Sequence, residues 1–347
     1  LMMELEERLN PDKNPYFDHA RIQYWVAWRG KTPVGRISAQ IDDHAIQHLG
    51  ENIGNFGFFE CEDNIETAKA LLSAAESWLL SNRMEKIYGP YCVTLSEEPG
   101  ILVDGFDKPA MMLMGHSRPY YAQLLEATGY AKVQDLYAYY RDIRESLMPP
   151  AVCKLIARIE SQNRLKLRQI KMKSYNEDLT IILDILNDAW QDNWGYIPMT
   201  DAELKYTADS LKMLIREDFV YIAELDNEPV GMMVTLPNIN EISKKIGGRL
   251  FPFGWLKLLW WLKMSKFRTV RVPLMGVRSK IQNSPYGAAI AFMLIEAIRI
   301  NAAGVGVPHA ELSWILEDNT RMRSILERMD CDKYKTYRVF GKDLGSS

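Results

Sequence analysis

Val270-Arg-Val-Pro-Leu-Met-Gly-Val277, followed a few residues later by Ser284-Pro-Tyr-Gly-Ala-Ala289, forms the segment on which the fold prediction depends. The first run alternates in a way that predicts a strand, and residues 287–301 predict a helix with apolar residues on every side. A glycine before such a helix lets a phosphate approach the backbone closely, because it has no Cβ. Free N–H groups at the helix start then favour the phosphate. The segment therefore predicts a strand, a phosphate-binding loop and a helix.

The hydrophobic pattern around this segment predicts an ordered set of strands and helices in the second half of the chain. Thr200 and Glu203 have the spacing of a capping box at a helix start. The predicted strands are 165–170, 219–225, 229–236, 269–277, 310–316 and 334–340, and the predicted helices are 177–190, one from 200, 250–264, 287–301 and 320–329.

A weak internal repeat relates the two halves of the chain. Pro33-Val-Gly35 and Pro229-Val-Gly231 both follow an apolar run and a polar turn, at an offset of 196 residues. A helix end and strand near Glu126 recur near Glu327 at an offset of 201. Because the offsets nearly agree, we expect two copies of one domain, of which the first lacks the opening strand and two helices.

The element order of the second half resembles the GNAT superfamily, the acyl-CoA N-acyltransferase fold. The match rests on strand 270–277, on the loop at 284–289 and on Glu311-Leu-Ser-Trp-Ile-Leu-Glu-Asp-Asn319 with the helix behind it. Phrases such as Gly100-Ile-Leu-Val-Asp-Gly-Phe-Asp-Lys-Pro109 are similar to a bacterial group of tandem acyltransferases in this superfamily. The resemblance implies an α/β fold of two tandem domains, each a mixed, mostly antiparallel sheet flanked by helices: residues 1–145, a linker helix at 146–164, and residues 165–347.

The resemblance also implies where acetyl-CoA or a longer acyl-CoA would bind. The expected cofactor-binding residues are those of the fourth strand, the loop and the last helix: Leu274, Met275, Gly276, Val277, Ser284, Tyr286, Gly287, Ala288, Ala289, Asn319 and Arg323. Ser284 departs from the usual Gln or Arg, and Arg278 and Lys280 could supply the missing charge or be solvated surface groups. The first half has no glycine at the matching place and four acidic residues within 60–66, so we expect that it does not bind CoA.

The catalytic residues do not follow directly from the resemblance, because the usual acid of the superfamily is absent. It is a Tyr seven residues after the Asn that opens the last helix, and Leu326 stands there in this chain. Carboxylates near the end of the fifth strand are the substitutes, so Glu311, Ser313 and Glu317 are the candidates for proton transfer. For Glu311 a structural ion pair is the plainer alternative.

Aromatic residues point to the acceptor side. Trp190, Trp194 and Tyr196 lie in a loop between two predicted helices that closes over the acceptor in the superfamily, and either bind substrate or anchor the loop. The Trp-rich segment 250–264 is a core or interface helix, a wall for a long acyl chain, or a peripheral membrane contact.

Composition limits the remaining possibilities. With 42 basic and 45 acidic residues the chain has a net charge of −3, which argues against a nucleic-acid partner. Four scattered cysteines and five histidines without ligand spacing predict neither disulfides nor a metal site, and fit a cytoplasmic protein. No apolar run is long enough to predict a transmembrane segment.

We therefore expect an acyltransferase in which the second domain transfers an acyl group from acyl-CoA to a small-molecule amine. Two alternatives remain open at this point. One is a scaffold or sensor that binds acyl-CoA without turnover, and the other is an enzyme similar to the N-acyl amino acid synthases of this fold, which takes its acyl group from an acyl carrier protein.

Overall fold

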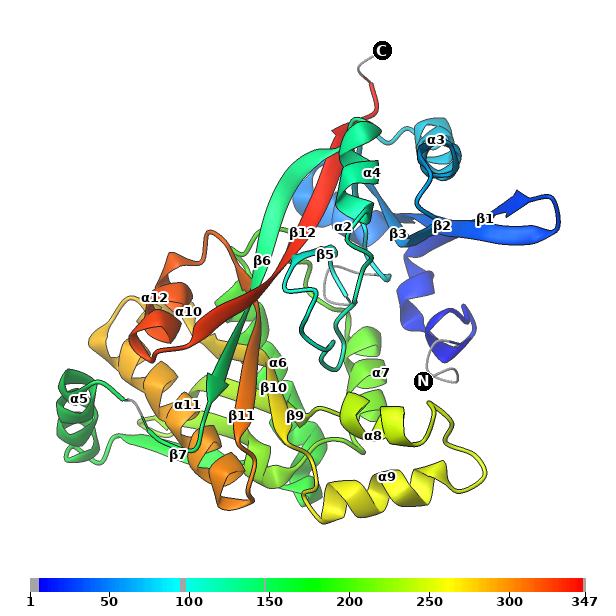
Figure 1. The fold of residues 1–347 in the computed structure, drawn as a ribbon. Coiled ribbons are helices and arrows are strands. Elements are labelled where there is room, and N and C mark those ends of the chain that lie inside the picture. Colours follow the sequence, from blue (N-terminus) through cyan, green and yellow to red (C-terminus); the bar gives the residue numbers. More distant parts are fainter. Residues whose placement is uncertain (1–5, 94–97, 147, 346–347) are drawn as a thin grey trace. The chain divides into compact units, whose positions relative to one another are not determined.

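The computed structural model describes residues 6–93, 98–146 and 148–345, and their contacts form two compact units (Figure 1). The first unit comprises residues 7–137 and the chain from 334 onward, and the second comprises chiefly residues 138–333. Each predicted domain is one continuous stretch of chain, whereas the contacts group the last strand with the first unit. The boundaries at 145 and 165 stay a prediction, and residues 1–5 of the first predicted domain lie outside the described residues.

The first unit is a mixed sheet in the order β1-β2-β3-β4-β12-β6, with β5 paired to β12. Helix α3 packs against β1, β2 and β3. Its strands are β1 Ala20–Arg29, β2 Thr32–Asp42, β3 Ile53–Cys61, β4 Lys86–Gly89, β5 Ile101–Asp104, β6 Ala131–Asp142 and β12 Asp332–Asp343, and its helices are η1 Pro15–Asp18, α2 Asp43–Leu49, α3 Ile65–Ser81 and α4 Tyr121–Ala127.

The second unit takes the last residues of β6 and continues as β6-β11-β10-β9-β8-β7. Its strands are β7 Leu165–Gln169, β8 Val220–Leu225, β9 Glu228–Pro237, β10 Thr269–Val277 and β11 His309–Leu316. Its helices are α5 Pro150–Glu160, η2 Met172–Ser174, α6 Tyr175–Trp190, α7 Asp201–Leu211, η3 Glu217–Phe219, α8 Asn240–Lys245, α9 Gly254–Lys263, α10 Ser279–Gln282, α11 Pro285–Gly304 and α12 Thr320–Arg328.

Helices cover both faces of the second sheet. A Cβ on Gly276 of β10 would contact Ala189 of α6, whereas a Cβ on Gly231 of β9 would lie 2.7 Å from Ile290 of α11. Gly276 is paired with Met232, the neighbour of Gly231, and successive strand residues face opposite ways. Helices α6 and α11 therefore pack on opposite faces of the sheet.

The predicted duplication is confirmed by matching irregularities in the two hairpins. The β1–β2 pairing shifts register between Ala27 and Trp28, and the β8–β9 pairing shifts between Ala223 and Glu224. Both positions are 196 residues apart, which is the offset of the two Pro-Val-Gly runs. The two mixed sheets flanked by helices are thus a tandem repeat, as the sequence predicted.

Helix α11 is the one described helix that is long and apolar enough to cross a membrane by length and composition. It packs against β8, β9 and β10, and half of its most apolar window is buried inside the structure. Because a core helix of a folded domain meets the same length and composition test, this feature is weak evidence for a membrane span.

Candidate functional site

The two central strands of the second unit separate part-way along their length. Strands β10 and β11 pair in parallel as far as Val272 with Leu312, and β10 then continues alone to Val277. On its other side β10 stays paired with β9, with a register irregularity between Arg271 and Leu274. Residues 273–277 therefore form an open edge, whose backbone groups facing away from β9 have no strand partner.

A buried polar cluster lies where the strands part. Arg271 and Glu311 face each other across the two strands, and both side chains are almost fully buried. Arg271 Nε donates to Ser313 Oγ at 2.9 Å and lies 3.7 Å from Glu311 Oε1. Ser313 Oγ in turn donates to Glu311 Oε1 at 2.6 Å. A buried charge is tolerated when it is paired and hydrogen-bonded, so these side chains hold one another in position.

The outermost member of this cluster is Ser313. It directly follows Leu312, the last residue of β11 that pairs with β10. Its hydroxyl accepts a hydrogen bond from Arg271 and donates one to Glu311. If Ser313 Oγ takes a proton from a substrate, it can therefore pass its own proton to the Glu311 carboxylate. The Arg271 guanidinium also lies 4.3 Å from the Trp314 ring centre.

The last residue of α6, Trp190, which was predicted to lie in a loop, reaches the open edge of β10. Trp190 Nε1 donates to Met275 O at 3.0 Å, and the Trp190 ring packs edge-on against Tyr196 with centroids 5.9 Å apart. Tyr196 Oη donates to Asn187 Oδ1 at 2.6 Å, and burial raises the pKa of Tyr196 to about 12. Trp194 lies half-buried in the loop after α6. Trp190, which is predicted to bind substrate, thus contacts Met275, which is predicted to bind the cofactor.

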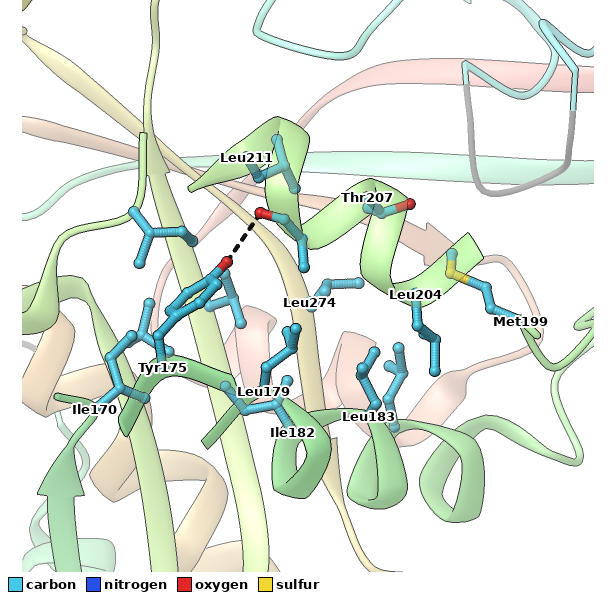
Figure 2. Close-up of a pocket in the computed structure, with 15 residues that line it drawn as sticks. Ile170, Tyr175, Leu179, Ile182, Leu183, Met199, Leu204, Thr207, Leu211 and Leu274 are labelled. Carbon is cyan, nitrogen blue, oxygen red and sulfur yellow. Dashed lines mark hydrogen bonds between the residues drawn. The ribbon is translucent and has the colours of Figure 1, made fainter. Parts of the chain in front are cut away.

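An apolar cavity of about 90 Å³ lies between α6, α7 and the sheet (Figure 2). The hydrogen bond drawn there, from Tyr175 Oη to Ala208 O at 3.0 Å, joins the two helices. Leu274, on the open edge of β10, is part of the wall. The lining is almost wholly apolar: Ile170, Tyr175, Leu179, Ile182, Leu183, Leu186, Met199, Leu204, Thr207, Ala208, Leu211, Ile215, Val220, Val234 and Leu274. The cavity therefore suits hydrocarbon that enters beside the open edge.

The start of α11 is more closed than the sequence suggests. Ser284 caps the helix, because its Oγ accepts from Gly287 N at 3.2 Å and donates to Ile281 O at 2.7 Å. A Cβ on Gly287 would lie 2.4 Å from Ile281 O and 2.8 Å from Gln282 O. Close packing of α10 on the start of α11 therefore accounts for the glycine. Ala288 and Ala289 follow in the first turn.

Charged groups around this loop are already paired with one another. Arg278 Nη2 contacts Asp184, and Lys280 Nζ lies 3.0 Å from Glu228 Oε2. The backbone N–H of Ser279 donates to Asp188 at 2.7 Å. A hollow of about 300 Å³ beside α10 is lined by two cations and two carboxylates, together with one proline: Asp188, Glu228, Pro229, Arg278 and Lys280. A pyrophosphate in this hollow would have to displace the carboxylates, although exposed ion pairs are weak.

The start of α12 adjoins the same loop. Arg321 Nη1 donates to Asn283 Oδ1 at 3.0 Å, which ties α12 to the residue before the α11 cap. Asn319 caps α12 by accepting from Met322 N at 3.0 Å. Arg323 Nη1 donates to Glu317 O at 2.7 Å, beyond the end of β11. Asn319 and Arg323 are thus near the loop, whereas Tyr286 points elsewhere, since its hydroxyl donates to Gln162 at 2.9 Å.

The equivalent place in the first unit is filled by its own chain. Strands β3 and β4 pair in parallel only as far as Asn55 with Tyr88. Beyond that point Tyr91 N donates to Phe56 O at 2.8 Å, and a Cβ on Gly57 would lie 1.7 Å from Tyr91 O. The gap between the strands is therefore occupied by backbone, which supports the expectation that the first domain binds no CoA.

Comparison with known proteins gives two close relatives. The bacterial ceramide synthase of Caulobacter vibrioides is 42% identical over 345 residues, which is 99% of this chain and 89% of the relative. Protein YghO of Escherichia coli is 42% identical over 344 residues, covering 99% of this chain and 87% of the relative. No family model matches the chain.

Solved structures share the fold. The tandem GNAT protein of the clavulanic acid biosynthesis pathway is similar over 96% of this chain and 85% of its own, with a TM-score of 0.55 and 12% identity. The chain has the tandem GNAT fold. It belongs to one family with the Caulobacter and Escherichia relatives. A glucosamine N-acetyltransferase region of a fungal β-N-acetylglucosaminidase is similar at a TM-score of 0.53, over 92% of this chain and 33% of the other.

Within this candidate site the structure brings some predicted residues together and separates others. Residues 274–277 form the open edge, and Glu311 and Ser313 form one cluster. Glu317 follows β11, which ends at Leu316. Leu326, where the superfamily has its Tyr acid, is fully buried. Among the described residues, no group of three or more His, Cys, Asp or Glu could hold a metal ion.

Two features of the candidate site were not predicted from the sequence. Arg271 carries the charge that pairs with Glu311, and its only signal was a lone arginine in an otherwise apolar strand. The cavity was missed because it depends on how α6 and α7 pack on the sheet. The signal available was the apolar spacing along residues 177–190, which predicts a helix but not a cavity beside it.

Proposed function

We propose that this chain is an N-acyltransferase that moves a long acyl chain from a thioester, acyl-CoA, to the amino group of a long-chain base, forming the amide of a ceramide. The observation that most strongly supports this proposal is the apolar cavity that reaches Leu274 on the open edge of β10. The Caulobacter relative, with which the chain shares a family, is a ceramide synthase, which supports a long-chain base as the acceptor.

The chemistry follows from the cluster at the strand separation. The thioester's pantetheine arm lies along residues 274–277, with its carbonyl beside Ser313. The amine nitrogen attacks the carbonyl carbon, the C–N bond forms and the C–S bond breaks. The proton leaving the nitrogen passes to Ser313 Oγ as that hydroxyl gives its own proton to Glu311, over the 2.6 Å hydrogen bond. Glu311 then returns this proton through Ser313 to the thiolate, which leaves as the free thiol, so Glu311 is a carboxylate again and protons balance over the cycle.

The cavity sets a condition on the acyl chain. At about 30 Å³ for each water-sized group, its 90 Å³ accommodates roughly three such groups. A long chain therefore has to part α6 from α7, and the Tyr175–Ala208 hydrogen bond is one contact that opening would break. Dispersion and burial along the apolar lining compensate for this opening.

The direct test incubates the purified chain with palmitoyl-CoA and sphinganine, and follows both the amide by mass spectrometry and the released thiol. We expect Glu311→Gln and Ser313→Ala to lower kcat by roughly 100-fold, within the usual range for general-base removal. Glu327→Gln is the matched control and should retain activity, because Glu327 is an exposed residue of α12. Amide formation by Glu311→Gln at the wild-type rate would remove Glu311 as the base.

The donor is tested separately, because the loop at α11 is lined by carboxylates. Palmitoyl-pantetheine, which lacks the pyrophosphate, is compared with palmitoyl-CoA and with a palmitoylated acyl carrier protein. If the loop holds the pyrophosphate, palmitoyl-CoA has the higher kcat/KM, and Arg321→Gln reduces that advantage. Equal kcat/KM values for the first two donors would mean that only the pantetheine arm is recognised.

A non-catalytic role is the second candidate, and the observation that favours it is Leu326 at the place of the usual Tyr acid. Such a protein would bind acyl-CoA but release no thiol when an amine is added. Thiol release that depends on sphinganine, and that is lost in Ser313→Ala, excludes this role.

A further inference from the structure

Helix α9 packs against the second unit on one side only, and its other side exposes apolar residues beside Lys257 and Lys263. Its inward face is formed by Leu258, Trp261 and Leu262, which are buried. The outward side carries apolar residues that are at least 40% exposed: Phe251, Phe253, Trp255, Leu256, Leu259, Trp260 and Met264. In Figure 1 the helix lies at the margin of its unit, joined to α8 by a long loop. A contiguous group of exposed apolar side chains with a polar rim is typical of a surface that meets another protein or a membrane.

Within the sequence window 242–268 the charged residues are all of one sign. Between residues 242 and 268 the chain has seven basic residues and no acidic one: Lys244, Lys245, Arg249, Lys257, Lys263, Lys266 and Arg268. The whole chain, in contrast, has a net charge of −3. All seven are solvent-exposed, so the positive charge is concentrated around the exposed aromatic side chains.

Helix α9 is also firmly attached to the unit that contains the cavity. Arg216 Nη1 donates to Leu262 O at 3.3 Å and to Ser265 Oγ at 2.9 Å. The Trp261 ring packs edge-on against Phe267 at 5.5 Å. Arg216 directly follows Ile215, which lines the cavity. The exposed surface of α9 is therefore a fixed platform that is connected to the cavity wall by adjacent residues.

We propose that residues 250–264, with the surrounding lysines and arginines, dock the protein on the surface of an anionic lipid bilayer. Exposed Trp, Phe and Leu enter the boundary between headgroups and acyl chains, while the lysines meet the negative headgroups. Charge complementarity selects this occupant: two copies of the surface would bring like charges together, which opposes a symmetric dimer through it. The proposal rests on α9 and its charges, and holds whether or not the chain makes ceramide.

The test is sedimentation of the full chain with vesicles of phosphatidylcholine alone and of equimolar phosphatidylcholine and phosphatidylglycerol. We expect binding to the anionic vesicles, and weak binding to the neutral ones. Lys257→Gln with Lys263→Gln should weaken binding about 30-fold, since each lysine near an anionic surface contributes a factor of roughly five. Phe253→Ser with Trp260→Gln should weaken it at least roughly tenfold.

Trp28→Gln is the matched control, because Trp28 on β1 is 61% exposed and Trp260 is 60% exposed. It should bind anionic vesicles as the wild type does, and thermal melts should show that every variant is folded. The proposal is overturned if the wild type does not bind anionic vesicles, if the α9 variants bind unchanged, or if Trp28→Gln loses binding. Self-association that Trp260→Gln abolishes, without vesicle binding, would identify the occupant as a second copy.

Discussion

Replacing Arg271 by methionine tests whether the buried cluster is held together by charge. Glu311 would keep a fully buried carboxylate with its cation removed, and Ser313 would lose the donor at 2.9 Å. Breaking a buried ion pair by removing one partner costs about 3–5 kcal/mol, because an uncompensated charge remains. At a Tm change of about 2–4 °C per kcal/mol for a unit of this size, we expect a fall of roughly 6–20 °C.

The assay is urea unfolding followed by tryptophan fluorescence, with Arg271→Met combined with Glu311→Leu as the decisive variant. Removing both charges leaves no unpaired ion, so the double variant should recover most of the lost free energy. Lys280→Met is the control, since its ion pair with Glu228 is exposed and should be worth less than about 1 kcal/mol. A cost below about 1 kcal/mol for Arg271→Met, or simple additivity in the double variant, would refute the reasoning.

Three further outcomes are expected. Ala208→Phe, which fills the cavity, should cost about 1–3 kcal/mol and lower the turnover of long-chain thioesters more than that of short ones, as measured on a chain-length series. Gly287→Val should lower the Tm because its Cβ would meet Ile281 O at 2.4 Å, whereas Gly304→Ala, with open space around it, should not. The folded-state pKa of Tyr196 is raised to about 12 from the ordinary value near 10, so its contribution to stability is present below about pH 10 and lost as pH rises toward 12; Tyr196→Phe should flatten that decline in alkaline melts.

The local elements of the second unit could be predicted from sequence because their patterns are long. Strand β10 has the predicted bounds of 269–277, and helix α11 extends the predicted 287–301 by a few residues at each end. Helices α8 and α10 were missed, since a helix of four to six residues is too short to show a period.

The candidate site could be predicted only as far as strand ends converge. Residues 274–277, Glu311 and Ser313 lie together because two parallel strands part at Val272 and Leu312. The partner of Glu311 could not be predicted, since the pairing of Arg271 with Glu311 is set by the register of strands 40 residues apart. The close approach of the α10 backbone to Gly287 could not be predicted, since α10 itself was not, and the phosphate contact at Gly287 stays a prediction.

Strand β12 has a consequence for how the chain is made. It lies between β4 and β6 in the sheet of the first unit, although it is the last strand of the described chain. A nascent chain emerging from the ribosome therefore presents an N-terminal unit with an unfilled central position until residues 332–343 have been synthesised. Expression of residues 7–137 alone should give an aggregating fragment rather than a folded domain. Because the last strand belongs to the first unit, the two repeats cannot be separated by cutting the chain between them.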